Sequence, residues 1–288
     1  MSVLDGIRAR NFLVIGRVGM DLSPDPAGTR TRDASSMMVA MGGSSANIAA
    51  GLVKFGCKAA LVTKVSDDAV GWYCLNQLDH YGVDRTHVHA ISGECRTSLA
   101  VYETRVEEHQ SVIYRNNAAD FQMDIADVEA VDYSQYGALI TAGTVFAAEP
   151  SRAATFRAFE LARAAGLPII FDVDYRPYSW PSAEVAADVL SRAGSMADVI
   201  VGNDEEFGFM AGGIDKGLDK ARKPTGAGDS FMAGLLAALS EGSEMKQAVL
   251  RGSACASIVV SRPGCAPAMP DHNELEAFLT THPGPTHV

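Results

Sequence analysis

Short apolar runs alternate with longer amphipathic stretches along most of this chain. The apolar runs are typical of buried strands, and they lie at residues 12–16, 59–65, 138–143, 167–173 and 199–202. Stretches with the apolar spacing of a helix lie between or after them, at residues 70–81, 151–165, 182–194 and from 231 onward. Because strand and helix alternate in this order, the pattern predicts a parallel sheet with helices on both faces.

Two segments, at about 17–40 and 95–118, interrupt this alternation. In the second, residues 97–102 and 110–114 alternate apolar and polar positions around a charged turn, which predicts a hairpin with one covered face. The first contains a polar stretch, 22–36, rich in Pro, Gly, Thr and Arg. We expect the two segments to pair into a small β-rich lid on a single domain that spans residues 1–288.

Composition narrows the class of protein. The chain has 288 residues, of which 47% are apolar and 20% charged, so a sizeable core is expected. The net charge of −11 argues against nucleic acid or an anionic membrane as a partner. Five scattered cysteines without a C-x-x-C pair suggest reduced thiols, and no apolar run approaches membrane-spanning length. These features predict a cytoplasmic protein with a small-molecule ligand.

The most informative stretch is a glycine loop that opens a helix. Thr225, Gly226, Ala227 and Gly228 lead to Asp229, and an apolar helical pattern follows at once. Glycines let the backbone approach an anion, and the first N–H groups of a helix have no internal partner. A carboxylate and a phosphate repel each other. An aspartate beside a phosphate site therefore suggests a chemical role, such as accepting a proton from an attacking hydroxyl. Taken alone, the loop fits an ordinary helix N-cap equally well.

A second glycine loop and the end of the first strand carry further polar side chains. Gly43 precedes a helix whose first turns are small, and Asn47 is the one strongly polar residue there. Its donors and acceptor suit a hydroxylated ligand, while plain helix packing is the alternative. Asp21 follows the first strand, at the sheet edge where ligands gather in open α/β folds. It is either an acceptor for substrate hydroxyls or a turn aspartate.

Two more strands end in polar residues. Arg176 follows the strand at 167–173 and offers a planar fork suited to a carboxylate or phosphate. Asn203 and Glu206 follow the strand at 199–202 and occupy the N-cap and capping-box positions of a helix. Capping alone explains both residues. A role in organising a metal requires phosphates nearby, which the loop at Gly226 would supply.

Three of these motifs together resemble the signatures of the ribokinase-like (PfkB) carbohydrate kinases. They are residues 41–49, the Asn203-x-x-Glu206 motif and residues 225–229, and their order and spacing fit from residue 12 to about 270. The resemblance implies a three-layer α/β/α sandwich with a small β-rich lid. It also implies ATP-dependent phosphorylation of a terminal hydroxyl, in which alignment and charge stabilisation supply most of the catalysis.

Finer detail points to a subgroup of this family. Residues 16–22, 113–120, 171–180 and 223–229 resemble kinases that act on 5-dehydro-2-deoxy-D-gluconate in myo-inositol breakdown. Kinases of 2-dehydro-3-deoxygluconate, or of other sugars, are the near alternative. An alternative of another class is a nucleotide or sugar-acid binding protein without catalysis. The joint presence of Asn203, Glu206 and Asp229 argues against that alternative.

The resemblance also implies a role for each candidate residue. Asp229 would be the base, with the N–H groups of Gly226, Ala227 and Gly228 holding charge on the transferred phosphoryl group. Sugar hydroxyls would contact Asp21, Gly43 and Asn47, and the substrate carboxylate would contact Arg115 and Arg176. The nucleotide would contact Asn203, Glu206, Thr225, Gly228 and Gly264. Mg²⁺ would be held, directly or through water, by Asn203 and Glu206. A monovalent cation such as K⁺ is a further candidate. Pairing of lids into a homodimer would protect exposed strand edges.

One departure from the family pattern is large. Residues 215–223 are charged and favour a helix, and Pro224 follows directly, so no apolar strand leads into the glycine loop. We therefore predict that a segment is missing between residues 222 and 224, one that would carry part of the nucleotide site. A measured mass near 30.4 kDa would show that the deletion is real.

Overall fold

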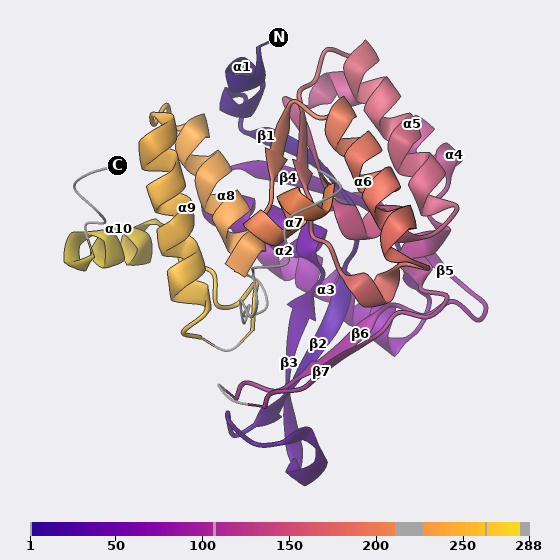
Figure 1. Ribbon diagram of the computed structural model, residues 1–288, viewed down its shortest axis with the longest axis vertical. Helices are drawn as coiled ribbons and strands as arrows, with labels where there is room; N and C mark the ends of the chain where they lie inside the picture. Colours follow the sequence, from indigo (N-terminus) through magenta and orange to yellow (C-terminus); the bar gives the residue numbers. More distant parts are fainter. Residues whose placement is uncertain (1, 106–107, 211–226, 263, 283–288) are drawn as a thin grey trace.

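The computed structural model describes residues 2–105, 108–210, 227–262 and 264–282. The predicted missing segment between residues 222 and 224 lies outside this range, as do Thr225 and Gly226 of the glycine loop. The polypeptide forms two sheets and two helical layers (Figure 1).

The larger sheet has six strands in the order β10-β9-β8-β1-β4-β5, and every neighbouring pair is parallel. This confirms the sheet type that the strand–helix alternation predicts. Strand β1 lies inside the sheet, between β8 and β4, so its carboxyl end lies near the middle of the edge where all the parallel strands end. The strands are β1 (Asn11–Ile15), β4 (Lys58–Ser66), β5 (Asp84–Ile91), β8 (Ala138–Ala142), β9 (Ile169–Asp172) and β10 (Val199–Val201).

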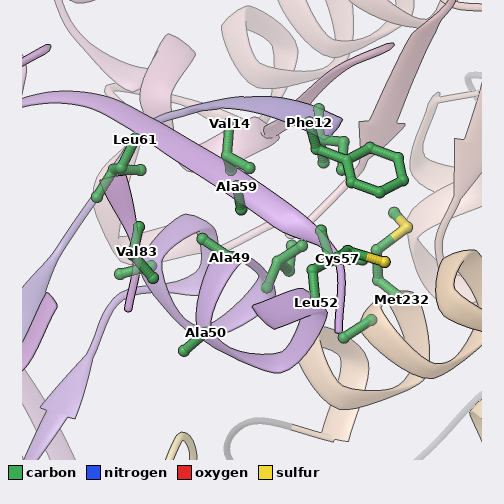
Figure 2. Packing of buried hydrophobic residues seen from close by; sticks show 14 of the residues in the cluster. Phe12, Val14, Ala49, Ala50, Leu52, Cys57, Ala59, Leu61, Val83 and Met232 are labelled. Atoms are coloured by element: carbon green, nitrogen blue, oxygen red, sulfur yellow. The ribbon is translucent and has the colours of Figure 1, made fainter. Parts of the chain in front are cut away.

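The apolar residues of β1 face opposite sides of the sheet in turn, as a pleated strand requires. Phe12 and Val14 join a core with helices α2 (Ser44–Lys54), α3 (Ala69–Tyr81) and α8 (Ala227–Ser240), part of which Figure 2 shows. Leu13 and Ile15 join a second core on the opposite face. That face is covered by α4 (Ile125–Glu129), α5 (Ser151–Ala164) and α6 (Ala183–Met196). Both faces of the sheet are therefore buried, which confirms the predicted three-layer sandwich.

The remaining helices lie at the periphery. Figure 1 shows α9 (Met245–Val259) beside α8, with α10 (His272–Thr281) beyond it. Helix α1 (Val3–Arg8) precedes β1, and the short helix α7 (Asp204–Met210) follows β10. Among the described residues, no helix combines the length and apolar character needed to cross a membrane.

The two predicted excursions form the second sheet, whose order is β3-β2-β6-β7. Strands β2 (Gly19–Asp25) and β3 (Ser36–Gly42) form one antiparallel pair, and β6 (Leu99–Tyr102) and β7 (Ser111–Tyr114) form the other. A parallel pairing of β2 with β6 joins them. Figure 1 shows this sheet projecting away from the helical layers. Part of the polar stretch 22–36 is thus paired strand.

Several elements leave little trace in the hydrophobic pattern. Strand β5 is mostly exposed, and only Val88 along it is buried, so it lacks the apolar run that marks its neighbours. Its pairing with β4 is a consequence of the tertiary fold. Helices α1, α4, α9 and α10 were likewise not predicted. An edge strand and peripheral helices bury one narrow stripe at most, so periodicity identifies them poorly.

The opposite edge of the large sheet carries an apolar groove. The three residues of β10 are only half-buried, and they line a cavity of about 350 Å³ together with side chains of α1, α7 and α8. Phe207 on α7, Leu4 on α1 and Met245 on α9 contribute exposed apolar surface there, at 42%, 42% and 58%. This edge of the sheet is therefore less completely covered than its centre.

Candidate active site

The proposed base, Asp229, lies where the N-terminal ends of helices α2 and α8 meet. Asp229 is in the first turn of α8 and is 8% exposed. Its Oδ2 accepts a hydrogen bond of 2.9 Å from Nδ2 of Asn47, in the first turns of α2, and one of 3.6 Å from the Cys265 thiol. The structure thus brings together Asn47 and Asp229, which the sequence analysis placed on separate motifs. The two helices approach closely, and a Cβ on Gly51 would come within 2.6 Å of Cβ of Ala233.

The glycine that opens α2 is required by its backbone. Gly43 is the N-cap residue of α2 and has φ of 98°, a conformation that side chains disfavour. A Cβ at this position would lie 2.5 Å from the carbonyl oxygen of Arg17. That same carbonyl accepts the N–H of Ala46 at 3.2 Å, so the loop after β1 is anchored to the start of α2. Gly43 therefore lets these two segments meet.

Asp21 lies on β2, beside this junction. Its carboxylate is 4% exposed and packs against the backbone of Gly42, which has no room for a side chain. Burial raises the pKa of Asp21 to about 6, and the positive charge of Arg17 opposes the rise. Asp21 is thus a buried acceptor rather than a solvated turn aspartate.

The carboxylates of the site raise one another's pKa. Burial, and then the negative charge of Asp174, raise the pKa of Asp229, while the hydrogen bond from Asn47 opposes this. Burial also raises the pKa of Asp172, at the end of β9, well above its usual range, with Asp174 the next cause. A carboxylate with a raised pKa is a stronger proton acceptor, which suits Asp229 to a role as a base.

The structure gives the two predicted arginines partners of their own. Arg115 is buried, and its guanidinium forms an ion pair with Asp120 and donates 3.1 Å to the carbonyl of Thr144. Arg176 forms an ion pair of 2.7 Å with Asp174 and lies 3.9 Å from Glu206, while its side chain is 43% exposed. Both cations therefore already face carboxylates of the protein.

Asn203 and Glu206 form a reciprocal cap at the start of α7. The N–H of Asn203 donates to Oε2 of Glu206 at 2.9 Å, and the N–H of Glu206 donates to Oδ1 of Asn203 at 3.1 Å. Oε1 of Glu206 also accepts the N–H of Tyr175 at 3.2 Å. Among the described residues, no three His, Cys, Asp or Glu side chains form a metal cluster. Carboxylate and amide oxygens that are already engaged suit Mg²⁺ held through water.

The glycines on the nucleotide side differ in their surroundings. Gly228 is exposed, and no atom of the described residues lies within 4 Å of the position that a Cβ would take. The adjoining Ala227 is half-buried. This open space at the start of α8 fits the close approach of a phosphate. Gly264 has φ of 79° and lies against Pro267 and Ala40 of β3.

Two residues of the site escaped the sequence analysis. Arg17 follows β1 by two positions, and its place after an apolar strand was a usable signal. Cys265 contacts Asp229 from a segment 36 residues further along the chain, and nothing in its sequence context predicts that contact.

Comparison with known proteins is consistent with this architecture. The sequence pattern of the pfkB family carbohydrate kinases matches residues 9–223 and 219–272. A 5-dehydro-2-deoxygluconokinase of Photobacterium profundum is 32% identical over 317 residues, covering 95% of this chain and 96% of the relative. One from Geobacillus thermodenitrificans is 31% identical over 312 residues, with 93% coverage of each chain.

Solved structures share the fold at lower identity. A 2-dehydro-3-deoxygluconokinase of Thermotoga maritima superposes with a TM-score of 0.82 at 19% identity, covering 94% of this chain and 99% of that one. A fructokinase of Vibrio cholerae, bound to fructose, ADP and a potassium ion, gives 0.81 at 23% identity, with 93% and 98% coverage. Since the family pattern and relatives above 30% identity both extend over most of its length, this chain belongs to the pfkB family of carbohydrate kinases.

Proposed function

We propose that this protein is an ATP-dependent kinase that phosphorylates the terminal hydroxyl of 5-dehydro-2-deoxy-D-gluconate. The observation that carries the proposal is the buried carboxylate of Asp229, held by Asn47 and Cys265 at the start of α8. The relatives named for this activity, at 31–32% identity over most of both chains, support the choice of substrate. The 2-dehydro-3-deoxygluconokinase likeness supports the fold and leaves that acid as the second candidate.

The side chains of the site fit a simple division of roles. Asp229 accepts the proton of the attacking hydroxyl. Asn47 holds that carboxylate through Nδ2, while its Oδ1 is buried without a partner and suits a substrate hydroxyl as acceptor. Asp21 supplies a second buried acceptor. The N–H groups of Ala227 and Gly228, at the start of α8, would stabilise negative charge on the transferred phosphoryl group.

Mg²⁺ is the metal that we propose for this site. Asn203 and Glu206 would hold it through water, since their oxygens already serve the cap of α7. The ion would neutralise charge on the phosphates of ATP. The potassium ion bound to the fructokinase of Vibrio cholerae supports a test of K⁺ as an activator.

The deletion before Pro224 remains a prediction. The family pattern matches in two parts that meet at residues 219–223, and the alignment with the Photobacterium relative spans 317 residues, more than the 288 of this chain. These numbers support a segment present in relatives and absent here. Titration with ATP, followed by calorimetry, measures whether this chain binds the nucleotide.

Release of ADP in the presence of a panel of sugars and sugar acids tests the activity. We expect 5-dehydro-2-deoxy-D-gluconate to give the highest kcat/KM, followed by 2-dehydro-3-deoxygluconate and then neutral sugars. A higher kcat/KM for a neutral sugar would contradict the proposed substrate. Binding of the acid without ADP release from any compound would favour a binding protein without catalysis.

We also propose that the second sheet mediates a homodimer. Its two edge strands, β3 and β7, carry exposed apolar side chains: Met37, Met38, Val39, Val112 and Tyr114 are 36–60% exposed. A second copy of this sheet would bury that surface and protect the edges. Sedimentation of the wild-type protein and of a Val39→Asp variant measures the assembly, and a wild-type monomer would contradict the proposal.

A further inference from the structure

Three arginines, Arg17, Arg115 and Arg176, each interact electrostatically with Asp21 or Asp174, and they differ in how their charge is balanced. Arg115 pairs with Asp120, and Arg176 pairs with Asp174. Arg17 has no carboxylate within ion-pair distance among the residues that the structure describes. A guanidinium that is partly withdrawn from water without a counter-charge is costly, so an anion at this place would be stabilised.

The hydrogen bonds of Arg17 lead to the same place. Its Nη1 donates 3.1 Å to Oγ of Ser98, which precedes β6 and is fully buried. Its Nε is buried without any partner. Nε of Arg115 is also buried without a hydrogen-bond partner. The two arginines therefore differ in whether a carboxylate pairs with them, and they do not differ in the state of Nε. In arginine, the N–H groups of Nε and Nη2 point the same way and form a two-donor fork that suits a carboxylate. Ser98 accepts from Nη1, so it does not occupy this fork.

The surroundings of Arg17 are the ones proposed for the sugar. Its carbonyl oxygen lies against Gly43, and its charge acts on the buried carboxylate of Asp21. Burial raises the pKa of Tyr178, and the positive charges of Arg176, Arg17 and Arg115 oppose that rise, so all three charges act on the same side chain. Arg17 is therefore near Gly43 and Asp21, which would hold the sugar, and among the described residues it is the member of the trio without an ion-paired carboxylate.

We propose that Arg17 is the residue that binds the substrate carboxylate and makes the site selective for a sugar acid. The inference rests on the proposed function, because it assigns one end of the same substrate. Ser98 fixes the guanidinium at Nη1, and the carboxylate accepts hydrogen bonds from the remaining fork. Arg115 and Arg176 add positive potential around it, with their own charges paired.

The test compares an acid with its neutral isostere. The ligands are 5-dehydro-2-deoxy-D-gluconate and the carboxamide of the same compound, and Kd is measured by calorimetry without nucleotide. For Arg17→Met we expect the Kd of the acid to rise about 10- to 100-fold, as loss of a charge-assisted pair implies, and that of the amide to change less than about 3-fold. Arg17→Lys should restore part of the affinity for the acid.

The matched control is Arg157→Met, which removes an equal charge from the exposed face of α5. It should leave both Kd values unchanged, and thermal unfolding checks that each variant is folded. An equal loss for acid and amide in Arg17→Met, or no loss for either, overturns the inference. So does wild-type protein that binds the acid no better than the amide. Acid binding that depends on Arg17 without ADP release would contradict the proposed kinase activity and leave this inference intact.

Discussion

The proposed sugar-binding side of the site and the edge of the sheet at β10 are held by the fold to very different degrees. Around Gly43, helix α2 is buried over Ser44–Leu52, and β1 is covered on both faces. At β10, all three residues are half-buried, and the adjoining groove of about 350 Å³ is lined by apolar side chains. The elements that carry the proposed sugar acceptors are packed on both faces, whereas the three residues of β10 stay half-buried.

The difference shows how one site can have parts of unequal stability. The acceptors Asp21 and Asn47 lie on elements whose neighbours are fully buried. Asn203 and Glu206 follow the half-buried strand β10, cap each other, and hold one further contact through the N–H of Tyr175. We therefore expect the sugar-binding half to tolerate few substitutions and the β10 edge to tolerate more.

The largest effect is expected at the base. Asp229→Asn should lower kcat about 10³-fold, within the range for loss of a general base, because the amide cannot accept the proton. The Kd of the sugar acid should change only a few-fold, since Asn47 retains its hydrogen-bonding partner in similar geometry. Single-turnover kinetics with calorimetry measures both quantities. Activity retained above one tenth of wild type would show that another group accepts the proton.

A pair of cavity-forming substitutions measures the stability contrast directly. Ile15→Ala, at a fully buried position of β1, should lower the free energy of unfolding by about 3–5 kcal/mol. Ile200→Ala, at the half-buried middle of β10, should lower it by about 1 kcal/mol. Denaturant titration of both variants checks the difference. Equal losses would mean that the edge is packed as firmly as the centre.

The buried carboxylate of Asp21 predicts a dependence of stability on pH. Its pKa of about 6 lies above the unfolded value of 3.8, so the folded state binds more protons between these values. Stability is therefore lost as the pH rises through this window, and the full penalty of about 2–3 kcal/mol is present above it.

Asp21→Asn should remove that penalty. The variant should be more stable than wild type at pH 8, with the gain vanishing near pH 4, while its KM for the sugar acid rises. Denaturant titrations at both pH values measure the gain, and Asp33→Asn, at an exposed carboxylate, serves as the control. A variant that is less stable than wild type at pH 8 would show that the attraction between the Asp21 carboxylate and Arg17 outweighs the cost of burying that carboxylate.

The smallest effect is expected at Cys265. Its thiol is a weak donor to Asp229, and the hydrogen bond lowers the pKa of that carboxyl against the effect of burial. Cys265→Ala should therefore move the acid limb of kcat/KM to higher pH and reduce the rate about 3-fold at neutral pH, whereas Cys265→Ser should retain most of both. A pH–rate profile that is identical in all three proteins would remove this role.

Sequence reasoning found the strands that carry an apolar run or a clear alternation, and it missed β5, which has neither. Phe12–Ile15 is an uninterrupted apolar run, and the structure confirms a strand there as β1. Strand β5 exists because β4 offers it hydrogen bonds, and its exposed side chains carry little apolar signal. The same reason explains the peripheral helices, whose buried stripes are narrow.

The candidate site divides in a similar way. Asp21, Asn47, Arg176 and Asp229 were found because polar residues after strands, or glycines before helices, mark the ligand edge of an α/β sheet. The pairing of each arginine could not be read from the sequence. Asp120 lies five residues from Arg115, and their ion pair depends on side-chain directions that the local fold sets.

The sequence by itself determined the parallel sheet, its two helical layers and the two small-residue helix starts, because these follow from local periodicity and backbone freedom. Only the tertiary structure decided that Asn47 meets Asp229 across 182 residues, that Cys265 joins them, and that Arg17 lacks a carboxylate partner among the described residues. Burial, charge balance and hydrogen-bond partners are properties of neighbours in space, and those neighbours come from distant parts of the chain.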